Sequence, residues 1–216
     1  MQRNEIIRLL NEKKYDELTE IAKKNTRGFF RLLIGLSYDK SDIVCWRAID
    51  VTGIIAGEIA KTDPALIRTL AQRLLWMLRD ESGNNLSSAP EMLGEIVRNS
   101  PDNFADIAPV IASFHDELMM RPGVLRAIFR IGETRPDLIS ISREFIEPYM
   151  RDEDPVVRLY ALYIAGAYKL REALPVISVL KDDAESATIY NEGDFHAIGV
   201  GQTAAKMHER LSEEEN

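Results

Sequence analysis

The sequence predicts an all-α fold, a right-handed α-solenoid (α-α superhelix) of two-helix repeats that ends in a small β-hairpin and a capping helix. Apolar residues recur at helical spacing along almost the whole chain. A short motif, an alanine followed five positions later by a glycine, also recurs, and self-similarity at a period of this size is typical of helical repeat proteins. Its four copies are Ala48 and Gly53, Ala89 and Gly94, Ala127 and Gly132, and Ala161 and Gly166, so the glycines are 41, 38 and 34 residues apart.

Two short amphipathic helices are expected ahead of the repeats, within residues 1–25. Apolar side chains fall on one side of residues 4–13, and a second apolar side follows in residues 15–24. Asn25 or Thr26 then stands where a side chain can cap the next helix.

Residues 26–181 are expected to form about four repeats, each with one plain amphipathic helix and one helix that carries the motif. Proline near the start of a helix loses no hydrogen bond, so proline–aspartate pairs mark helix starts. Four such pairs occur, at Asp63-Pro64, Pro101-Asp102, Pro136-Asp137 and Asp154-Pro155. Glycine inside a helix costs about 1 kcal/mol relative to alanine, so a recurring glycine indicates that a neighbouring helix approaches closely.

Residues 182–216 depart from the repeat pattern. Residues 186–198 hold β-favouring side chains around the turn residues at 191–194, which predicts a hairpin. A final helix over residues 200–211 and an acidic tail would cover the apolar end of the stack, as terminal repeats must. We expect the whole chain, 1–216, to form a single domain.

Composition limits the function classes. The net charge is −8, from 35 acidic and 27 basic residues, which disfavours a nucleic-acid binder. Cys45 is the only cysteine and lies in an apolar run, so a buried structural thiol is expected. The N-terminus is unlike a signal peptide, and no stretch approaches the roughly 18 apolar residues of a spanning helix. A cytoplasmic protein without membrane contact is therefore expected.

Two segments carry a resemblance to a known family. DEDPVVRLYALYIAG at 152–166 and DIVCWRA at 42–48 resemble HEAT-like repeats of the phycobilisome-lyase type. The likeness covers roughly residues 26–181 and departs from the family pattern at 80–88 and in the hairpin. It implies the solenoid fold and motif helices that line its concave face.

On that face, the outward positions would lie six and three residues before each motif glycine and one residue after it. The resulting stripe mixes arginine, acidic and aromatic side chains, and arginine and tyrosine are enriched in protein interfaces. A solvated face with weak local salt bridges is the alternative interpretation. The stripe comprises Arg47, Asp50, Ile54, Ser88, Glu91, Glu95, Arg126, Phe129, Glu133, Tyr160, Tyr163 and Ala167.

The polar loop around Glu81, Asn84 and Asn85 is a second candidate, because loops on rigid scaffolds often carry binding groups. A simple connection between two helices is the alternative. Trp76 is expected in the core, and the core is also favoured for Trp46 over a place in the groove, since aromatic side chains carry much of the packing area.

No catalytic pattern emerges from the spacing of reactive residues. His115, His196 and His208 do not form the i, i+4 pair of a helical metal site, so no metal or cofactor is expected. The sequence therefore favours a non-catalytic interaction or scaffold module that binds another protein. The alternatives are an enzyme or enzyme subunit of the bilin-lyase type and, less favoured, a nucleic-acid binder similar to alkylpurine DNA glycosylases. The net acidic stripe argues against the last of these.

Overall fold

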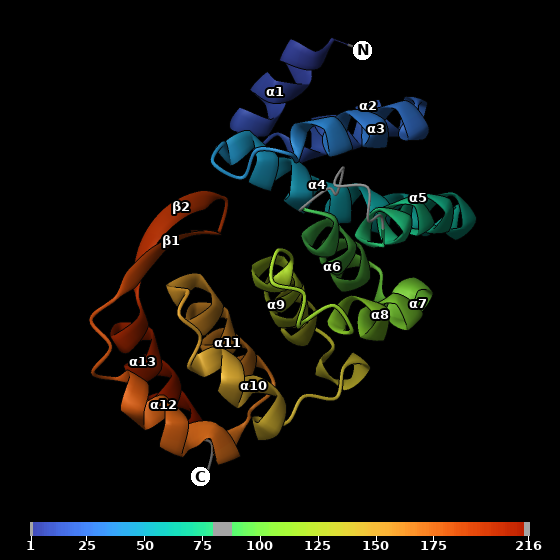
Figure 1. Ribbon diagram of the computed structural model, residues 1–216. Helices are drawn as coiled ribbons and strands as arrows, with labels where there is room; N and C mark the ends of the chain where they lie inside the picture. Colours follow the sequence, from blue (N-terminus) through green and yellow to red (C-terminus); the bar gives the residue numbers. More distant parts are fainter. Residues whose placement is uncertain (1, 80–87, 214–216) are drawn as a thin grey trace. The chain divides into compact units, whose positions relative to one another are not determined.

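The computed structural model describes residues 2–79 and 88–213 (Figure 1). Within these ranges, thirteen α-helices follow one another, and one two-stranded hairpin lies near the C-terminus. The predicted all-α architecture with a terminal hairpin and helix is confirmed. The chain divides into two compact units, residues 1–111 and 112–216, and each is described here by itself.

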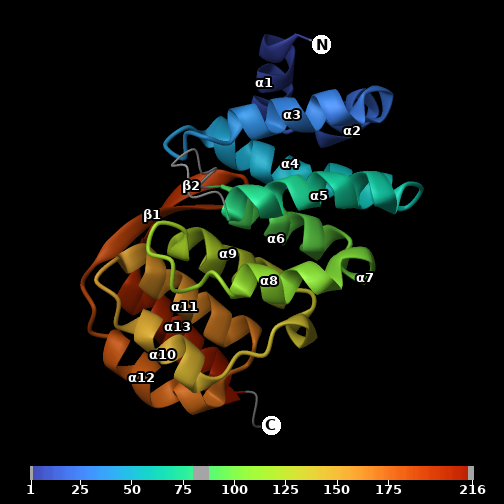
Figure 2. The ribbon, with the colours of Figure 1, turned by 45° about the vertical axis from the view of Figure 1, so that its right-hand side comes forward.

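Unit 1 begins with the predicted N-terminal helical pair and continues into the first motif helices. Motif helix α4 packs lengthwise on motif helix α6, while α2, α3 and α5 also pack on α4. Figures 1 and 2 both show α3 and α7 on opposite sides of α5. The helices are α1 (Arg3–Asn11), α2 (Tyr15–Lys24), α3 (Thr26–Leu36), α4 (Ile43–Ala60), α5 (Pro64–Leu78), α6 (Ala89–Asn99) and α7 (Pro101–Phe104), followed by a 3-10 turn (Ala105–Ile107) and α8 (Ala108–Ala112).

Side-chain caps begin several helices close to the predicted residues. The Asn25 side chain accepts a hydrogen bond from the Gly28 amide at 3.1 Å, and the Asp63 carboxylate accepts one from the Leu66 amide at 3.0 Å. Helix α4 is capped by Asp42, one residue after the predicted Ser41. Each cap satisfies an amide that has no partner inside its helix.

Two of the expected partner helices are shorter than their apolar spacing indicates. The segment after Pro101 breaks into α7, a 3-10 turn and α8, because Pro109 has no amide hydrogen to continue the helical ladder. The segment after Pro136 forms only a 3-10 turn before Ile139 becomes extended, with ψ of 122°. Helix α10 then starts after Ser142, whose hydroxyl caps it.

Unit 2 repeats the packing of motif helices. Helix α11 packs on α9 and on α13, and α10 and α12 pack against α11 and α13 respectively. Its elements are α9 (Arg121–Gly132), a 3-10 turn (Pro136–Leu138), α10 (Arg143–Met150), α11 (Pro155–Ala167), a 3-10 turn (Arg171–Ala173), α12 (Leu174–Leu180), β1 (Ser186–Asn191), β2 (Asp194–Gly199) and α13 (Val200–Glu213).

The hairpin closes with a two-residue turn. Strands β1 and β2 pair antiparallel from Ser186 opposite Gly199 to Asn191 opposite Asp194. Glu192 and Gly193 both have positive φ, 51° and 84°, which suits the right-handed twist of the strands.

One buried arginine joins the base of this hairpin to helix α11. The Arg158 guanidinium pairs with the Asp183 carboxylate at 2.9 Å and with the Glu185 carboxylate, and it donates to the carbonyl of Glu153 at 3.0 Å. The Val200 amide in turn donates to the Glu185 carbonyl at 2.9 Å. These contacts fix the C-terminal segment onto the last motif helix.

Three motif glycines stand where a side chain would meet a close neighbour. A Cβ atom on Gly53 would lie 2.5 Å from the Glu95 carbonyl oxygen on α6. A Cβ on Gly132 would overlap the Tyr168 ring, and one on Gly166 would lie 2.6 Å from the Met207 sulfur. The predicted close approach of a neighbouring helix is confirmed at Gly53, whereas Gly132 and Gly166 each meet a side chain.

No helix in the described ranges has both the length and the apolar character required to cross a membrane.

Candidate functional site

In unit 1, the predicted stripe residues hold helices together. The buried Arg47 guanidinium donates to the Asn11 side-chain oxygen at 2.9 Å and to its carbonyl at 3.3 Å, which ties α4 to the end of α1. The fully buried Ser88 hydroxyl donates to the Ser37 carbonyl at 2.6 Å. These contacts connect segments far apart in the sequence.

Glu91 forms a partly buried ion pair in the same region. Its carboxylate lies 2.6 Å from the Lys40 ammonium group and is 1% exposed. The Lys40 ammonium also lies 5.9 Å from the Trp46 ring centroid, and the Trp46 indole donates to the Lys40 carbonyl at 2.9 Å. The favoured core position of Trp46 is therefore wrong, because the side chain is only half-buried and contacts Lys40.

In unit 2, the stripe positions of adjacent motif helices meet. Phe129 and Tyr163, each three residues before its motif glycine, stack with ring centroids 5.1 Å apart. Tyr160 lies 6.4 Å from the Tyr163 ring, and burial raises the pKa of the Tyr163 hydroxyl. Glu133 pairs with Arg130 at 2.5 Å. The register inferred from the motif thus places equivalent positions together.

The expectation that this stripe faces solvent is nevertheless wrong for most of it. Helices α4, α6, α9 and α11 are packed on several sides, so the positions called outward lie against neighbouring side chains. Asp50, Phe129 and Tyr163 are half-buried, and only Glu133 of the ten proposed binding residues is exposed. Six are buried, namely Arg47, Ser88, Glu91, Glu95, Arg126 and Tyr160.

A binding role for the stripe stays a prediction. The loop candidates Glu81, Asn84 and Asn85 lie outside the described residues.

Two further features of the described residues concern the single cysteine and groups of possible metal ligands. Cys45 is buried, as predicted, and burial raises its pKa to about 11. Among the residues described, no group of three His, Cys, Asp or Glu side chains is arranged to hold a metal ion.

Trp76 was expected in the core, and this prediction is wrong because its side chain is 65% exposed. The buried side of α5 consists of Ile67, Ala71, Leu74 and Leu78. Trp76 is two residues from both Leu74 and Leu78, which is about 200° around the helix. The apolar run LLWML hides this spacing, although counting along the helix would have revealed it.

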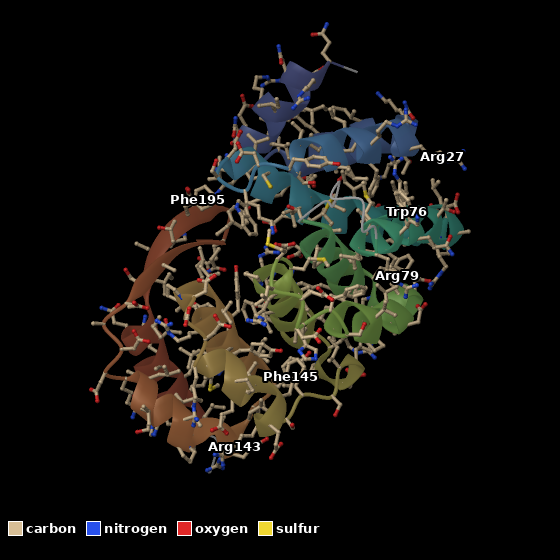
Figure 3. The ribbon with its side chains drawn as sticks, in the orientation of Figure 1. Arg27, Trp76, Arg79, Arg143, Phe145 and Phe195 are labelled. Carbon is tan, nitrogen blue, oxygen red and sulfur yellow. The ribbon has the colours of Figure 1, made fainter. Side chains whose placement is uncertain are left out.

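Helices α3 and α5 carry exposed arginines, and α5 also carries Trp76, but neither helix contains an acidic residue. Neither the 11 residues of α3 nor the 15 of α5 include Asp or Glu. The chain average of 35 acidic residues in 216 would give about four. We give the name arginine face to the exposed arginines of these two helices together with Trp76: Arg27 and Arg31 on α3, and Arg73, Trp76 and Arg79 on α5 and its end. Figure 3 labels Arg27, Trp76 and Arg79, which lie on the right-hand side of unit 1 in that view.

The arginines of this face have no carboxylate partner among the described residues. Arg27 also lies in the first turn of α3, where the helix dipole disfavours a cation. Arg68, on the flank of α5, behaves differently. Its guanidinium pairs with Asp106 at 2.8 Å and lies 5.2 Å from the Phe104 ring centroid.

A hollow of about 360 Å³ adjoins the face and is lined by residues of α1 and α3. The lining residues are Arg3, Gly28, Arg31, Leu32 and Gly35. A Cβ atom on Gly35 would meet no atom within 4 Å, so no neighbouring helix requires this glycine. Arg31 belongs to both the hollow and the arginine face.

Comparisons with known proteins bear on the fold alone. No family model and no curated protein sequence matches the chain. An engineered protein from the Northeast Structural Genomics Consortium is similar in structure, with a TM-score of 0.54 and 16% identity over 98% of this chain and 97% of its own. The archaeal HEAT-like repeats protein from Thermococcus onnurineus NA1 aligns over the same shares at 14% identity with a TM-score of 0.41, too low to support an argument.

Proposed function

We propose that this chain is a non-catalytic protein-interaction module whose docking surface is the arginine face of unit 1. The observation that carries the proposal is Trp76, a large apolar side chain that is 65% exposed on helix α5. Tryptophan and arginine are the residue types most enriched among the few side chains that dominate binding energy in protein interfaces. Exposed apolar surface rimmed by charged groups is typical of interaction sites.

The predicted stripe has a different role in this proposal. Its charged members form contacts inside the fold, such as those of Arg47 with Asn11 and of Glu91 with Lys40. Groups that are already paired and desolvated offer little to a partner. An enzyme-subunit role, which the resemblance to phycobilisome-lyase-type repeats would imply, gains no support from these contacts. The cytoplasm stays the expected compartment.

Site-specific photo-crosslinking tests the proposal. A benzophenone amino acid replaces Trp76 in one variant and Val179 in a matched control, because Val179 is 74% exposed on α12 in unit 2. After irradiation in the native host, we expect discrete protein adducts from position 76 and none from position 179. Equal labelling at both positions, or none at position 76, would contradict the proposed docking surface.

A further inference from the structure

We infer that the arginine face receives an acidic segment of a partner protein, with carboxylates flanking one apolar side chain. This inference rests on the proposed function and specifies the chemistry of the partner. It is drawn from three features of unit 1: the arginines that have no carboxylate partner among the described residues, the position of Trp76 and the hollow beside α3.

The charge of the face selects the occupant. Guanidinium groups bind carboxylates through two parallel hydrogen bonds, and those of Arg27, Arg31, Arg73 and Arg79 are exposed without an acidic partner in the described ranges. The chain as a whole carries a net charge of −8. A short acidic segment can remain within the roughly 8–10 Å over which these arginines act in physiological salt. A nucleic-acid strand would extend its phosphates beyond the face and over an acidic protein.

Trp76 offers an apolar contact between the charged contacts offered by Arg73 and Arg79. Arg73 and Arg79 lie three residues before and after Trp76, so each guanidinium flanks the ring by about one helical turn. A partner side chain that covers the ring would therefore have its neighbouring carboxylates close to both arginines. This spacing favours an occupant in which an apolar residue is followed and preceded by Glu or Asp.

The hollow provides a second point of attachment. Helical geometry places Gly28, Leu32 and Gly35 on the flank of α3 that faces the hollow, and Arg27 on its other flank. Because Gly35 has open space above it, a partner side chain can reach the helix backbone there, beside Arg3 and Arg31. A larger side chain at position 35 would occupy this space without disturbing the packing of α3.

Peptide titration tests the inference. The probes are a synthetic peptide of Glu with Leu at every fourth position, the same peptide with Gln in place of Glu, and single-stranded oligo(dT). Tryptophan fluorescence reports binding, since the chain has only two tryptophans and Trp76→Phe supplies the blank. We expect the acidic peptide to change the Trp76 emission and to bind at least about tenfold more tightly than the Gln peptide at low salt.

Matched variants locate the effect. The quadruple variant Arg27→Gln, Arg31→Gln, Arg73→Gln, Arg79→Gln should lose at least about tenfold in affinity for the acidic peptide. A control that removes four exposed cations of unit 2 changes the net charge equally and should retain affinity within about twofold. Gly35→Leu should weaken binding while Gly35→Ala does not. The control cations are Arg151, Lys181, Lys206 and Arg210.

Several outcomes would overturn the inference. These are equal affinity for the Gln peptide, tighter binding of oligo(dT), and a dimer in sedimentation that Trp76→Ala abolishes, which would make a second copy the occupant. If position 76 crosslinks to a protein segment without acidic residues, the inference fails while the proposed function stands. If position 76 gives no adduct and no peptide alters the emission, both fail.

Discussion

Substituting the motif glycines tests whether they are required by the packing of neighbouring helices. In Gly53→Ala, the new methyl group would lie 2.5 Å from the Glu95 carbonyl oxygen, 2.6 Å from the Asn99 amide nitrogen and 2.7 Å from the Glu95 Cβ. A carbon and an oxygen normally remain at least about 3.3 Å apart, so α4 and α6 must separate. Overpacking of this kind costs up to about 3 kcal/mol, and the better helix propensity of alanine returns about 1 kcal/mol. The net loss is about 2 kcal/mol.

Two other glycines provide internal comparisons. Gly35→Ala places its methyl group in open space, so only the gain in helix propensity of about 1 kcal/mol remains. Gly166→Ala meets the Met207 sulfur at 2.6 Å, but that atom is near the end of a flexible side chain and can move away. We therefore expect Gly35→Ala to be more stable than the parent protein and Gly166→Ala to be about as stable. Gly53→Ala should be less stable than the parent.

Thermal unfolding followed by circular dichroism measures these differences. For a chain of this size, 1 kcal/mol shifts the midpoint by about 2–4 °C, so Gly53→Ala should melt about 4–8 °C lower and Gly35→Ala about 2–4 °C higher. Far-ultraviolet spectra of the folded variants check that helix content is retained. If Gly53→Ala melts as high as Gly35→Ala, close packing does not explain the motif glycines.

Three further predictions follow from single residues. Trp76→Gln should change stability by no more than about 0.5 kcal/mol, because the ring is 65% exposed, and a loss of about 3 kcal/mol in urea unfolding would show that it is a core residue. Arg158→Met should cost about 3 kcal/mol by leaving Asp183 without its partner, and hydrogen exchange of the β1 and β2 amides should accelerate, whereas unchanged exchange would exclude the anchoring role. Burial raises the pKa of Cys45 from 9.0 to about 11, so the stability this group contributes is present below pH 9 and is lost as the pH rises to 11. Denaturation midpoints at several pH values, with Cys45→Ala as the control, measure this loss, and identical pH profiles would refute it.

The sequence predicted local features whose causes are local. The caps at Asn25 and Asp63 and the turn at Glu192 and Gly193 depend on neighbouring residues only, so short patterns were enough to find them. The motif glycines were predicted for a related reason, since glycine has a known cost in a helix and its recurrence needs an explanation.

Exposure was harder to predict, because it depends on which segments pack on each helix face. Position counting grouped Phe129 with Tyr163 correctly, yet it could not show that Arg47 would meet the end of α1 or that Glu91 would meet Lys40. Those partners are 36 and 51 residues away along the chain. The burial of Trp76 was predicted wrongly for a different reason. Its apolar neighbours in the sequence were taken as a sign of burial, although they lie on another side of the helix.

The Arg158 cluster determines where this chain could be shortened or joined to another repeat array. A chain that ended before Asp183 would leave a buried guanidinium without the carboxylates of residues 183 and 185. The last motif helix and the segment that leads into the hairpin would therefore have to be gained, lost or exchanged as one block. In this region the smallest segment that could be transferred intact extends across a repeat boundary. The repeat boundary indicated by the sequence spacing is therefore not a suitable point for truncation or fusion.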